Sequence, residues 1–91
     1  MGIMNKILLI EDDQSINKIL AYELSKKGYQ VDSLFDGKEA VQTILKNDYD
    51  LVLVDWMLPY QDGVSIIKEV RSNDYVKPLI LLTARSEQED I

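Results

Sequence analysis

The sequence predicts a single α/β domain in which helices cover both faces of a parallel β-sheet. Short apolar strand patterns alternate with amphipathic helical patterns along the 91 residues of the chain. Two of the strands, residues 7–10 and 51–54, are unbroken apolar runs, which is typical of strands buried on both faces. No repeat, low-complexity tract or linker interrupts the order βαβαβαβ. Alternating units of this length form parallel sheets with right-handed crossovers.

The first part of the chain is expected to contain a strand, a helix and a second strand. The two strands are Lys6 to Ile10 and Gln30 to Phe35. Between them, residues 15–27 show the helical period and end at Gly28, which adopts a left-handed conformation at little cost. The apolar face of this helix is expected to consist of Ile16, Ile19, Leu20 and Leu24. The opposite face is expected to consist of Asn17, Lys18, Glu23, Lys26 and Lys27.

A second helix and a third strand follow. Asp36 and Glu39 are typical of an N-cap and a capping-box glutamate, so they predict the start of a helix. The side chains that this helix is expected to bury are Ala40, Val41, Ile44 and Leu45. A short turn then leads into the third strand, residues 51–54.

A third helix and a fourth strand complete the pattern. Asp62 and Gly63 open a helix whose inward side chains are expected to be Val64, Ile66, Ile67 and Val70. Residues 78–82 form the fourth strand. A further capping box, residues 86–89, predicts that another helix begins before the last residue.

The composition excludes several classes of function. The chain has 10 basic and 16 acidic residues, a net charge of −6, which argues against a nucleic-acid contact by this segment. It has neither cysteine nor histidine, so disulfides, thiol catalysis, zinc–thiolate sites and histidine chemistry are ruled out. Its apolar runs are far shorter than the roughly 20 residues of a membrane span, and its start does not read as a signal peptide. A cytoplasmic protein without membrane contact is therefore expected.

Acidic residues follow two of the predicted strands at the point where each strand ends. Asp55 comes directly after residues 51–54, and Glu11, Asp12 and Asp13 follow the first strand. In open α/β sheets, ligands bind outside the carboxyl ends of the strands. Two carboxylates about 4 Å apart repel by roughly 4 kcal/mol at an effective dielectric of about 20. Because such a cluster is costly without a cation, the arrangement predicts a bound divalent metal beside Asp55.

Other residues near the strand ends complete a recognisable pattern. Met57-Leu58-Pro59 follows Asp55, Asp62-Gly63 lies shortly beyond, and Leu82-Thr83-Ala84-Arg85 ends the fourth strand. With these motifs at these spacings, the chain from about Lys6 to Ile91 resembles the receiver domain of bacterial two-component response regulators. It most resembles the OmpR/PhoB-like branch. The resemblance implies a flavodoxin-like, doubly wound parallel sheet of the CheY-like type.

The resemblance also implies a role for each acidic residue at the strand ends. Asp55 would be the phosphoacceptor, a carboxylate nucleophile that forms an aspartyl phosphate. Asp12 would bind Mg²⁺ directly, Glu11 would reach it directly or through water, and the main-chain carbonyl of Met57 would add another oxygen. Asp13 would either assist the metal or cap the first helix, and the cap is favoured.

Further implied roles concern the switch and its partners. Thr83 would hydrogen-bond a phosphoryl oxygen and move toward it on phosphorylation, and Ala84 would leave room for the phosphoryl group. The phosphoryl group would come from the phosphohistidine of a partner sensor histidine kinase or from a small phosphodonor. The chain would be a switch rather than an enzyme, and it would act in transcription regulation through an attached DNA-binding domain. Trp56, the single tryptophan, is expected near the site and partly exposed.

The C-terminal part of the sequence departs from the resemblance. Residues 1–91 are expected to form an incomplete receiver domain that lacks strand five with its lysine, helix five and the output domain. Lys77 cannot replace that lysine because it precedes the fourth strand. The fourth strand would then be an open edge, and uncovering several hundred Å² of apolar surface costs on the order of 10 kcal/mol. A homodimer, with exchanged elements as one form, is therefore expected instead of a stable monomer.

Three alternatives differ from this interpretation. The chain could be a phosphorylation-incompetent fragment that acts only as a folding or dimerisation unit. A haloacid-dehalogenase-like phosphatase needs a second aspartate two residues after the first, where this chain has Met57. A dinucleotide-binding fold needs a glycine-rich loop after the first strand, where this chain has Glu11-Asp12-Asp13.

Overall fold

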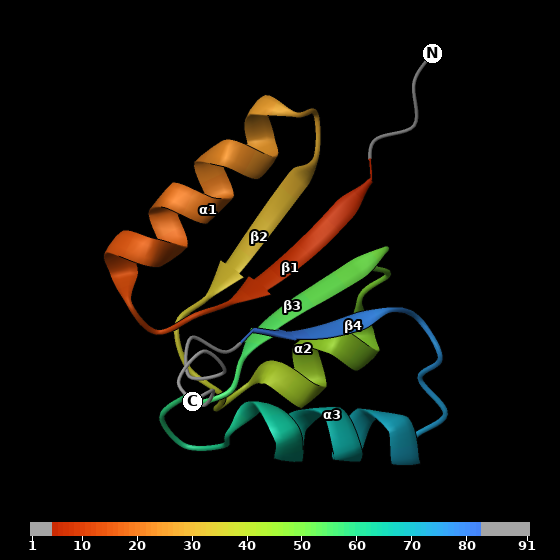
Figure 1. Cartoon of the computed structure of the whole chain (residues 1–91). Helices are drawn as coiled ribbons and strands as arrows, with labels where there is room; N and C mark the ends of the chain where they lie inside the picture. Colours follow the sequence, from red (N-terminus) through yellow and green to blue (C-terminus); the bar gives the residue numbers. More distant parts are fainter. Residues whose placement is uncertain (1–4, 83–91) are drawn as a thin grey trace, which may run out of the picture.

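A parallel four-stranded sheet forms the centre of the fold (Figure 1). The computed structural model describes residues 5–82. Within them the strand order is β2-β1-β3-β4, which confirms the predicted doubly wound, flavodoxin-like sheet. The chain passes from β1 to β2 on one side and then crosses to β3 on the other, so β1 and β3 meet at the topological switch point. The strands are β1 (Lys6–Ile10), β2 (Gln30–Leu34), β3 (Leu51–Asp55) and β4 (Leu79–Leu82).

Helices lie on both faces of the sheet. Helix α1 (Gln14–Lys26) packs against β1 and β2, whereas α2 (Ala40–Lys46) and α3 (Gly63–Ser72) cover the opposite face (Figure 1). Successive strand residues point to opposite faces, so alternate residues of β1 and β3 enter the core beneath α2 and α3. Within residues 5–82, no helix is long and apolar enough to cross a membrane. The buried residues of this core are Leu8, Ile10, Ala40, Ile44, Tyr49, Val52, Val54, Ile66 and Val70.

Local sequence signals set several element boundaries as predicted. The Asp13 carboxylate accepts a hydrogen bond from the Ile16 amide at 3.0 Å, which makes Asp13 the N-cap of α1. Asp62 caps α3 in the same way, with the Ser65 amide at 2.8 Å. Gly28 has a φ of 97°, as expected for a glycine that ends a helix.

The predicted faces of α1 are wrong at three positions. Asn17, expected on the outer face, is 1% exposed, whereas Ile16 and Ile19, expected inward, are 46% and 61% exposed. The Asn17 side-chain amide forms three hydrogen bonds with the ends of β1 and β2. A buried polar group with partners is common in proteins, and apolar periodicity alone does not reveal it.

Helix α2 begins later than predicted and buries fewer side chains. Its N-cap is Glu39, which makes no side-chain capping bond, and Asp36 instead accepts a hydrogen bond from the Lys38 amide at 2.9 Å. The predicted capping box is therefore wrong, because the residues around Lys38 form a turn ahead of the helix. Leu45, expected to be buried, is 40% exposed. A helix of only 7 residues presents one narrow face to the core, and Ala40 and Ile44 fill it.

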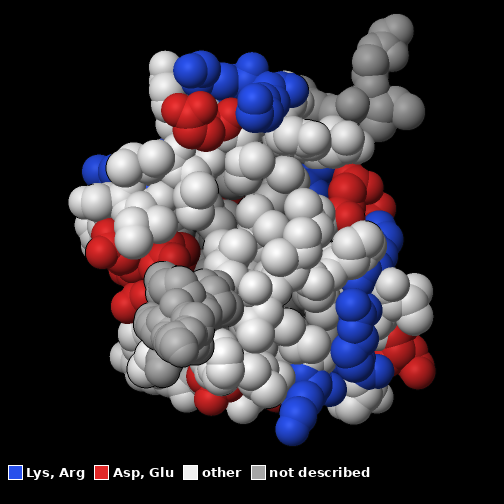
Figure 2. Space-filling model, viewed as in Figure 1, with Lys and Arg blue, Asp and Glu red and all other residues white. Residues whose placement is uncertain are grey.

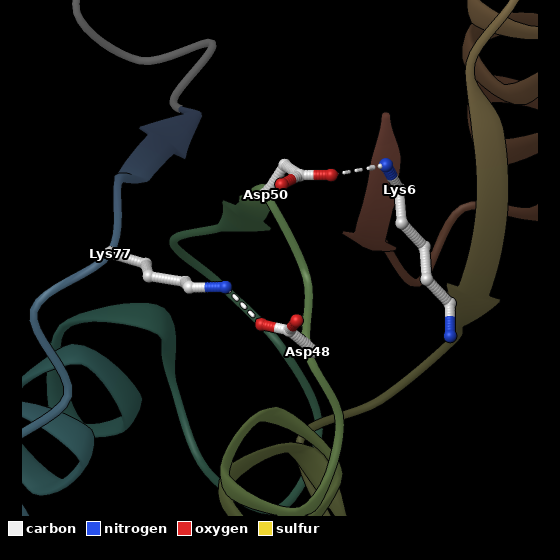
Figure 3. Close-up of polar contacts among 4 residues, drawn as sticks. All are labelled: Lys6, Asp48, Asp50 and Lys77. Atoms are coloured by element: carbon white, nitrogen blue, oxygen red, sulfur yellow. Dashed lines mark hydrogen bonds and ion pairs between the residues drawn. The ribbon is translucent and has the colours of Figure 1, made fainter. Parts of the chain in front are cut away.

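Charged residues connect the amino ends of the strands (Figure 3). The Lys6 backbone amide donates a hydrogen bond to the Asp50 carboxylate at 2.8 Å. The Lys77 ammonium forms an ion pair with Asp48, which lowers the pKa of Asp48 and raises that of Lys77. Lys77 therefore lies at the end of the sheet opposite the acidic strand ends, as predicted.

The sheet face that carries α1 is only partly covered. Figure 2 shows a broad uncharged area over β1, β3 and β4 beside α1. Ile80 of β4, the edge strand of the described sheet, is 48% exposed. A cavity of about 380 Å³ opens on this side, beside Ile7, Leu24 and Leu51. The exposed Ile80 side chain and the apolar residues that line this cavity make this face a candidate contact surface.

Candidate functional site

The candidate site lies where β1 and β3 end beside one another. The two strands are in parallel register, with Ile10 paired to Val54, so the residues that follow them emerge at the same edge. This edge is also the topological switch point, the usual ligand-binding crevice of doubly wound sheets. Three acidic residues leave the sheet here, namely Glu11, Asp12 and Asp55.

The structure brings the side chains of these three residues together. A carboxylate oxygen from each of Glu11, Asp12 and Asp55 lies within 4.8 Å of the others. Glu11 is 7% exposed, Asp55 is half-buried and Asp12 is exposed, so the cluster opens toward solvent on the Asp12 side. Oxygen donors at these separations suit a hard divalent cation such as Mg²⁺, which binds through one or two carboxylates and keeps several waters.

Burial and mutual repulsion favour protonated carboxyls in the cluster. Burial is the largest cause that raises the pKa of Glu11; the Asp13 amide opposes this, and the charges of Asp55 and Asp12 add to the rise. Burial likewise raises the pKa of Asp55, the Trp56 amide opposes it, and the Asp12 charge adds to it. A cation would favour the ionised forms and offset the repulsion. The residues present therefore fit a divalent metal.

A cavity adjoins the cluster on the side of the loop that follows β3. It has a volume of about 540 Å³ and is open to solvent. Met57 lies in its lining beside Asp12, and Trp56 is 41% exposed, which confirms the expected partial exposure of the tryptophan. The complete lining consists of Asp12, Trp56, Met57, Leu58, Pro59 and Asp62.

Glycine allows α3 to start directly against the end of β3. The Gly63 amide donates a hydrogen bond to the Trp56 carbonyl at 2.8 Å. A Cβ at Gly63 would meet the Asp55 carbonyl oxygen and, at 2.7 Å, a methyl group of Leu81. Only glycine fits this position without displacing the backbone that carries Asp55.

The β3–α3 loop contains a strained turn held by the neighbouring loop. Tyr60 has a φ of 76°, and the Gln61 amide donates to the Pro59 carbonyl at 2.9 Å, which together indicate the rare γ-turn of positive φ. The Gly37 amide of the β2–α2 loop donates to the same Pro59 carbonyl at 2.9 Å. The Lys38 ammonium nitrogen Nζ lies 5.7 Å from the centre of the Tyr60 ring. These contacts fix the loop that lines the cavity.

Asn17 lies in a buried environment that its place in the helical pattern does not predict. Its Nδ2 donates to the backbone carbonyl of Glu11 at 3.0 Å and to that of Leu34 at 3.3 Å, and its Oδ1 accepts from Ser33 Oγ at 2.7 Å. The only signal available in the sequence was a polar residue four positions after the N-cap Asp13. Thr83 and Ala84, which the resemblance places beside the phosphoacceptor, lie outside the described residues.

Comparison with known proteins identifies the family. Residues 7–91 match the response regulator receiver domain, and the chain therefore belongs to this family. Response regulator ArlR of Staphylococcus saprophyticus is 40% identical over 87 residues, which are 96% of this chain and 39% of that protein. Transcriptional regulatory protein DltR of Streptococcus agalactiae is 44% identical over 85 residues, 93% of this chain and 38% of that protein. The chain thus spans about two fifths of the length of these relatives.

Solved structures of the same family share the fold. Response regulator TrrA of Thermotoga maritima, solved in complex with Mg²⁺ and BeF, superposes with a TM-score of 0.86 at 34% identity. That alignment covers 97% of this chain and 77% of TrrA. The receiver domain of sensor histidine kinase PA1611 of Pseudomonas aeruginosa, with magnesium in its active-site cleft, gives a TM-score of 0.88 at 36% identity. That alignment covers 97% of this chain and 74% of the PA1611 receiver domain. The chain therefore has the CheY-like receiver fold.

Proposed function

We propose that this chain is the phosphoacceptor receiver segment of a two-component response regulator, with Asp55 as the residue that accepts the phosphoryl group. The observation that carries the proposal is the meeting of Glu11, Asp12 and Asp55 at one edge of the sheet, beside an open cavity. Asp55 is the member at the end of β3; it is half-buried, and its backbone carbonyl lies closely against Gly63 at the start of α3. A carboxylate in this position is fixed in place and can be reached from solvent.

The other residues of the site would hold a metal and the phosphoryl group. Glu11, Asp12, Asp55 and the main-chain carbonyl of Met57 would bind Mg²⁺, which when bound offsets the negative charge of the phosphoryl oxygens. A carboxylate oxygen of Asp55 attacks the phosphorus of the donor, and the bond between the phosphorus and the leaving group breaks. Thr83 would hydrogen-bond a phosphoryl oxygen of the product.

The partners follow from the family. Residues 1–91 contain no histidine, so a phosphohistidine donor would lie outside this segment, and we take it to belong to a sensor histidine kinase. We place the chain in the OmpR/PhoB-like branch, with a DNA-binding output domain switched by phosphorylation in the cytoplasm. Two relatives support an attached domain that acts in transcription: ArlR and DltR are each more than twice as long as the matched segment, and DltR is named a transcriptional regulatory protein. The receiver segment itself would act as a switch and make no nucleic-acid contact.

Labelling by a small phosphodonor tests this proposal. The chain is incubated with an acyl phosphate, with Mg²⁺ or with excess chelator, and its intact mass is measured. We expect a gain of one phosphoryl group that needs Mg²⁺ and is lost in Asp55→Asn. Asp62→Asn is the matched control, because Asp62 lines the same cavity but caps α3. Labelling of Asp55→Asn equal to that of the parent chain would show that Asp55 is not the phosphoacceptor.

A second candidate function is favoured by the partly open sheet face. Here the 91-residue chain would act as a folding or dimerisation unit without accepting phosphoryl groups, pairing with a second copy through β4 or by exchange of elements. The exposure of Ile80 and the uncharged area beside α1 support this alternative (Figure 2). Failure of the labelling experiment in a chain that is folded and self-associated would favour it.

A further inference from the structure

Asn17 is the most deeply buried polar residue outside the carboxylate cluster in the described part of the chain. Asn17 is 1% exposed, and both the nitrogen and the oxygen of its side-chain amide form hydrogen bonds. Nδ2 donates to the carbonyls of Glu11 and Leu34, and Oδ1 accepts from the Ser33 hydroxyl at 2.7 Å. Because a carbonyl can only accept, these partners place Nδ2 at the Glu11 and Leu34 carbonyls and leave Oδ1 to accept from Ser33.

This amide joins three elements at one point. Asn17 belongs to α1, Glu11 follows β1, and Ser33 and Leu34 end β2. The Leu34 carbonyl also accepts a hydrogen bond from the Glu11 amide at 3.1 Å, so the end of the β1–β2 ladder and the Asn17 contact share one acceptor. The contact therefore continues the sheet hydrogen bonding beyond the last strand residue.

The loop from Glu11 to Asp13 is held by Asn17 at both ends. At one end the Asn17 side chain binds the Glu11 carbonyl; at the other its backbone amide donates to the Asp13 carbonyl at 2.8 Å. Inside this loop the Glu11 carboxylate accepts a hydrogen bond from the Asp13 amide at 2.9 Å. Asp12, the exposed member of the cluster, lies between the two fixed points.

We propose that Asn17, supported by Ser33, is a positioning residue for the cation site, and that it sets the orientation of the Glu11 and Asp12 carboxylates. This inference rests on the proposed function, since it assigns Asn17 to the same metal site. Asn17 would not contact the metal itself. It acts through the backbone of Glu11 and Asp12, whose carboxylates would bind the metal. Partners that orient metal ligands commonly account for 10–100-fold in affinity.

The test compares Mg²⁺ affinity among variants of the whole chain, followed by Trp56 fluorescence. Asn17→Leu keeps a similar volume but removes the amide, and we expect its Mg²⁺ dissociation constant to rise about tenfold. Ser33→Ala is the milder variant, with an expected rise of about threefold, below that range because Ser33 acts only through Asn17. Tyr49→Phe is the matched control, because it removes another hydrogen bond of a largely buried side chain, to Asp32 at 2.8 Å, away from the site. It should leave the dissociation constant unchanged.

A readout without metal tests the positioning itself. Hydrogen exchange of the Asp13 amide reports its bond to the Glu11 carboxylate, and we expect faster exchange in Asn17→Leu but not in Tyr49→Phe. If Mg²⁺ binds the parent chain and Asn17→Leu equally well, the inference is overturned while the proposed function stands. If the parent chain binds no Mg²⁺, the proposed function fails. The inference then fails with it, whereas an unchanged Asp13 exchange rate in Asn17→Leu would overturn the inference alone.

Discussion

At the scale of single residues, the Asp55 carboxyl is held in a setting that favours its protonated form. Burial and the Asp12 charge raise its pKa, so the folded protein binds this proton more tightly than the unfolded chain does. The stability gained from that proton is fully present below the unfolded pKa and is lost as the pH rises through the folded pKa. At neutral pH without metal, the ionised Asp55 therefore opposes folding.

Asp55→Asn should consequently stabilise the metal-free chain. In chelator at neutral pH we expect its free energy of unfolding to rise by about 1 kcal/mol, because asparagine has no charge to bury and none for Asp12 to repel. Urea denaturation of both proteins, with and without Mg²⁺, measures this. Mg²⁺ should stabilise the parent chain and have little effect on Asp55→Asn. A variant less stable than its parent in chelator would show that the partly buried charge of Asp55 does not oppose folding.

Two tyrosines offer a paired test of hydrogen bonding. The Tyr49 hydroxyl donates to Asp32 at 2.8 Å, whereas the buried Tyr75 hydroxyl has no hydrogen-bond partner among the described residues. We expect Tyr49→Phe to lower the free energy of unfolding by about 1 kcal/mol, and Tyr75→Phe to leave it unchanged or raise it. Equal losses in the two variants would mean that hydroxyl packing, not the Asp32 bond, sets the cost.

The Tyr49 contribution should also depend on pH. Burial and then the Asp32 carboxylate raise the pKa of Tyr49 to about 12, from an ordinary value of 10. Its stabilising effect is thus fully present below pH 10 and is lost as the pH rises through about 12. The stability difference between the parent chain and Tyr49→Phe, measured by urea denaturation across this range, should shrink. A difference that stays constant up to pH 12 would argue against the raised pKa.

At the scale of elements, the junction between β3 and α3 depends on close approach of backbones. Gly63→Ala would place a Cβ against the Asp55 carbonyl and a Leu81 methyl, so we expect a loss of about 3 kcal/mol in unfolding free energy. Gly28→Ala is the control, because a Cβ there meets nothing within 4 Å and only its φ of 97° is unfavourable. We expect it to cost about 1 kcal/mol, measured by urea denaturation. Equal costs would contradict the role of close approach.

The strands were predictable from the sequence because their signals are local. The apolar runs before Glu11 and Asp55 gave β1 and β3 to within one residue, and the acidic residues after them gave the edge where the cluster forms. Asn17 was not predictable, because its burial depends on carbonyls that only the folded sheet brings within reach. The start of α2 was predicted too early, because the Asp36 carboxylate accepts a hydrogen bond from the Lys38 amide in the turn ahead of the helix and does not cap the helix.

At the scale of the whole molecule, the open sheet face should control self-association. Ile80 is 48% exposed on the edge strand of the described sheet, and a broad uncharged area lies over β1, β3 and β4 beside α1 (Figure 2). We expect the 91-residue chain to form dimers at micromolar concentration and Ile80→Lys to shift it toward monomer, since a charge on an edge strand opposes pairing. Sedimentation velocity measures both. Val76→Lys is the control, because Val76 is 86% exposed but precedes β4. A monomeric parent chain with cooperative unfolding would contradict the expectation.

The central claim is that Glu11, Asp12 and Asp55 form one cation site beside the phosphoacceptor, and a Mg²⁺ titration tests it most directly. Trp56 is the single tryptophan and lines the adjoining cavity, so its fluorescence reports binding there. We expect a saturable change in the parent chain that Asp12→Asn abolishes. A response that is flat, or that persists unchanged in Asp12→Asn, would mean that these carboxylates do not act together as a metal site.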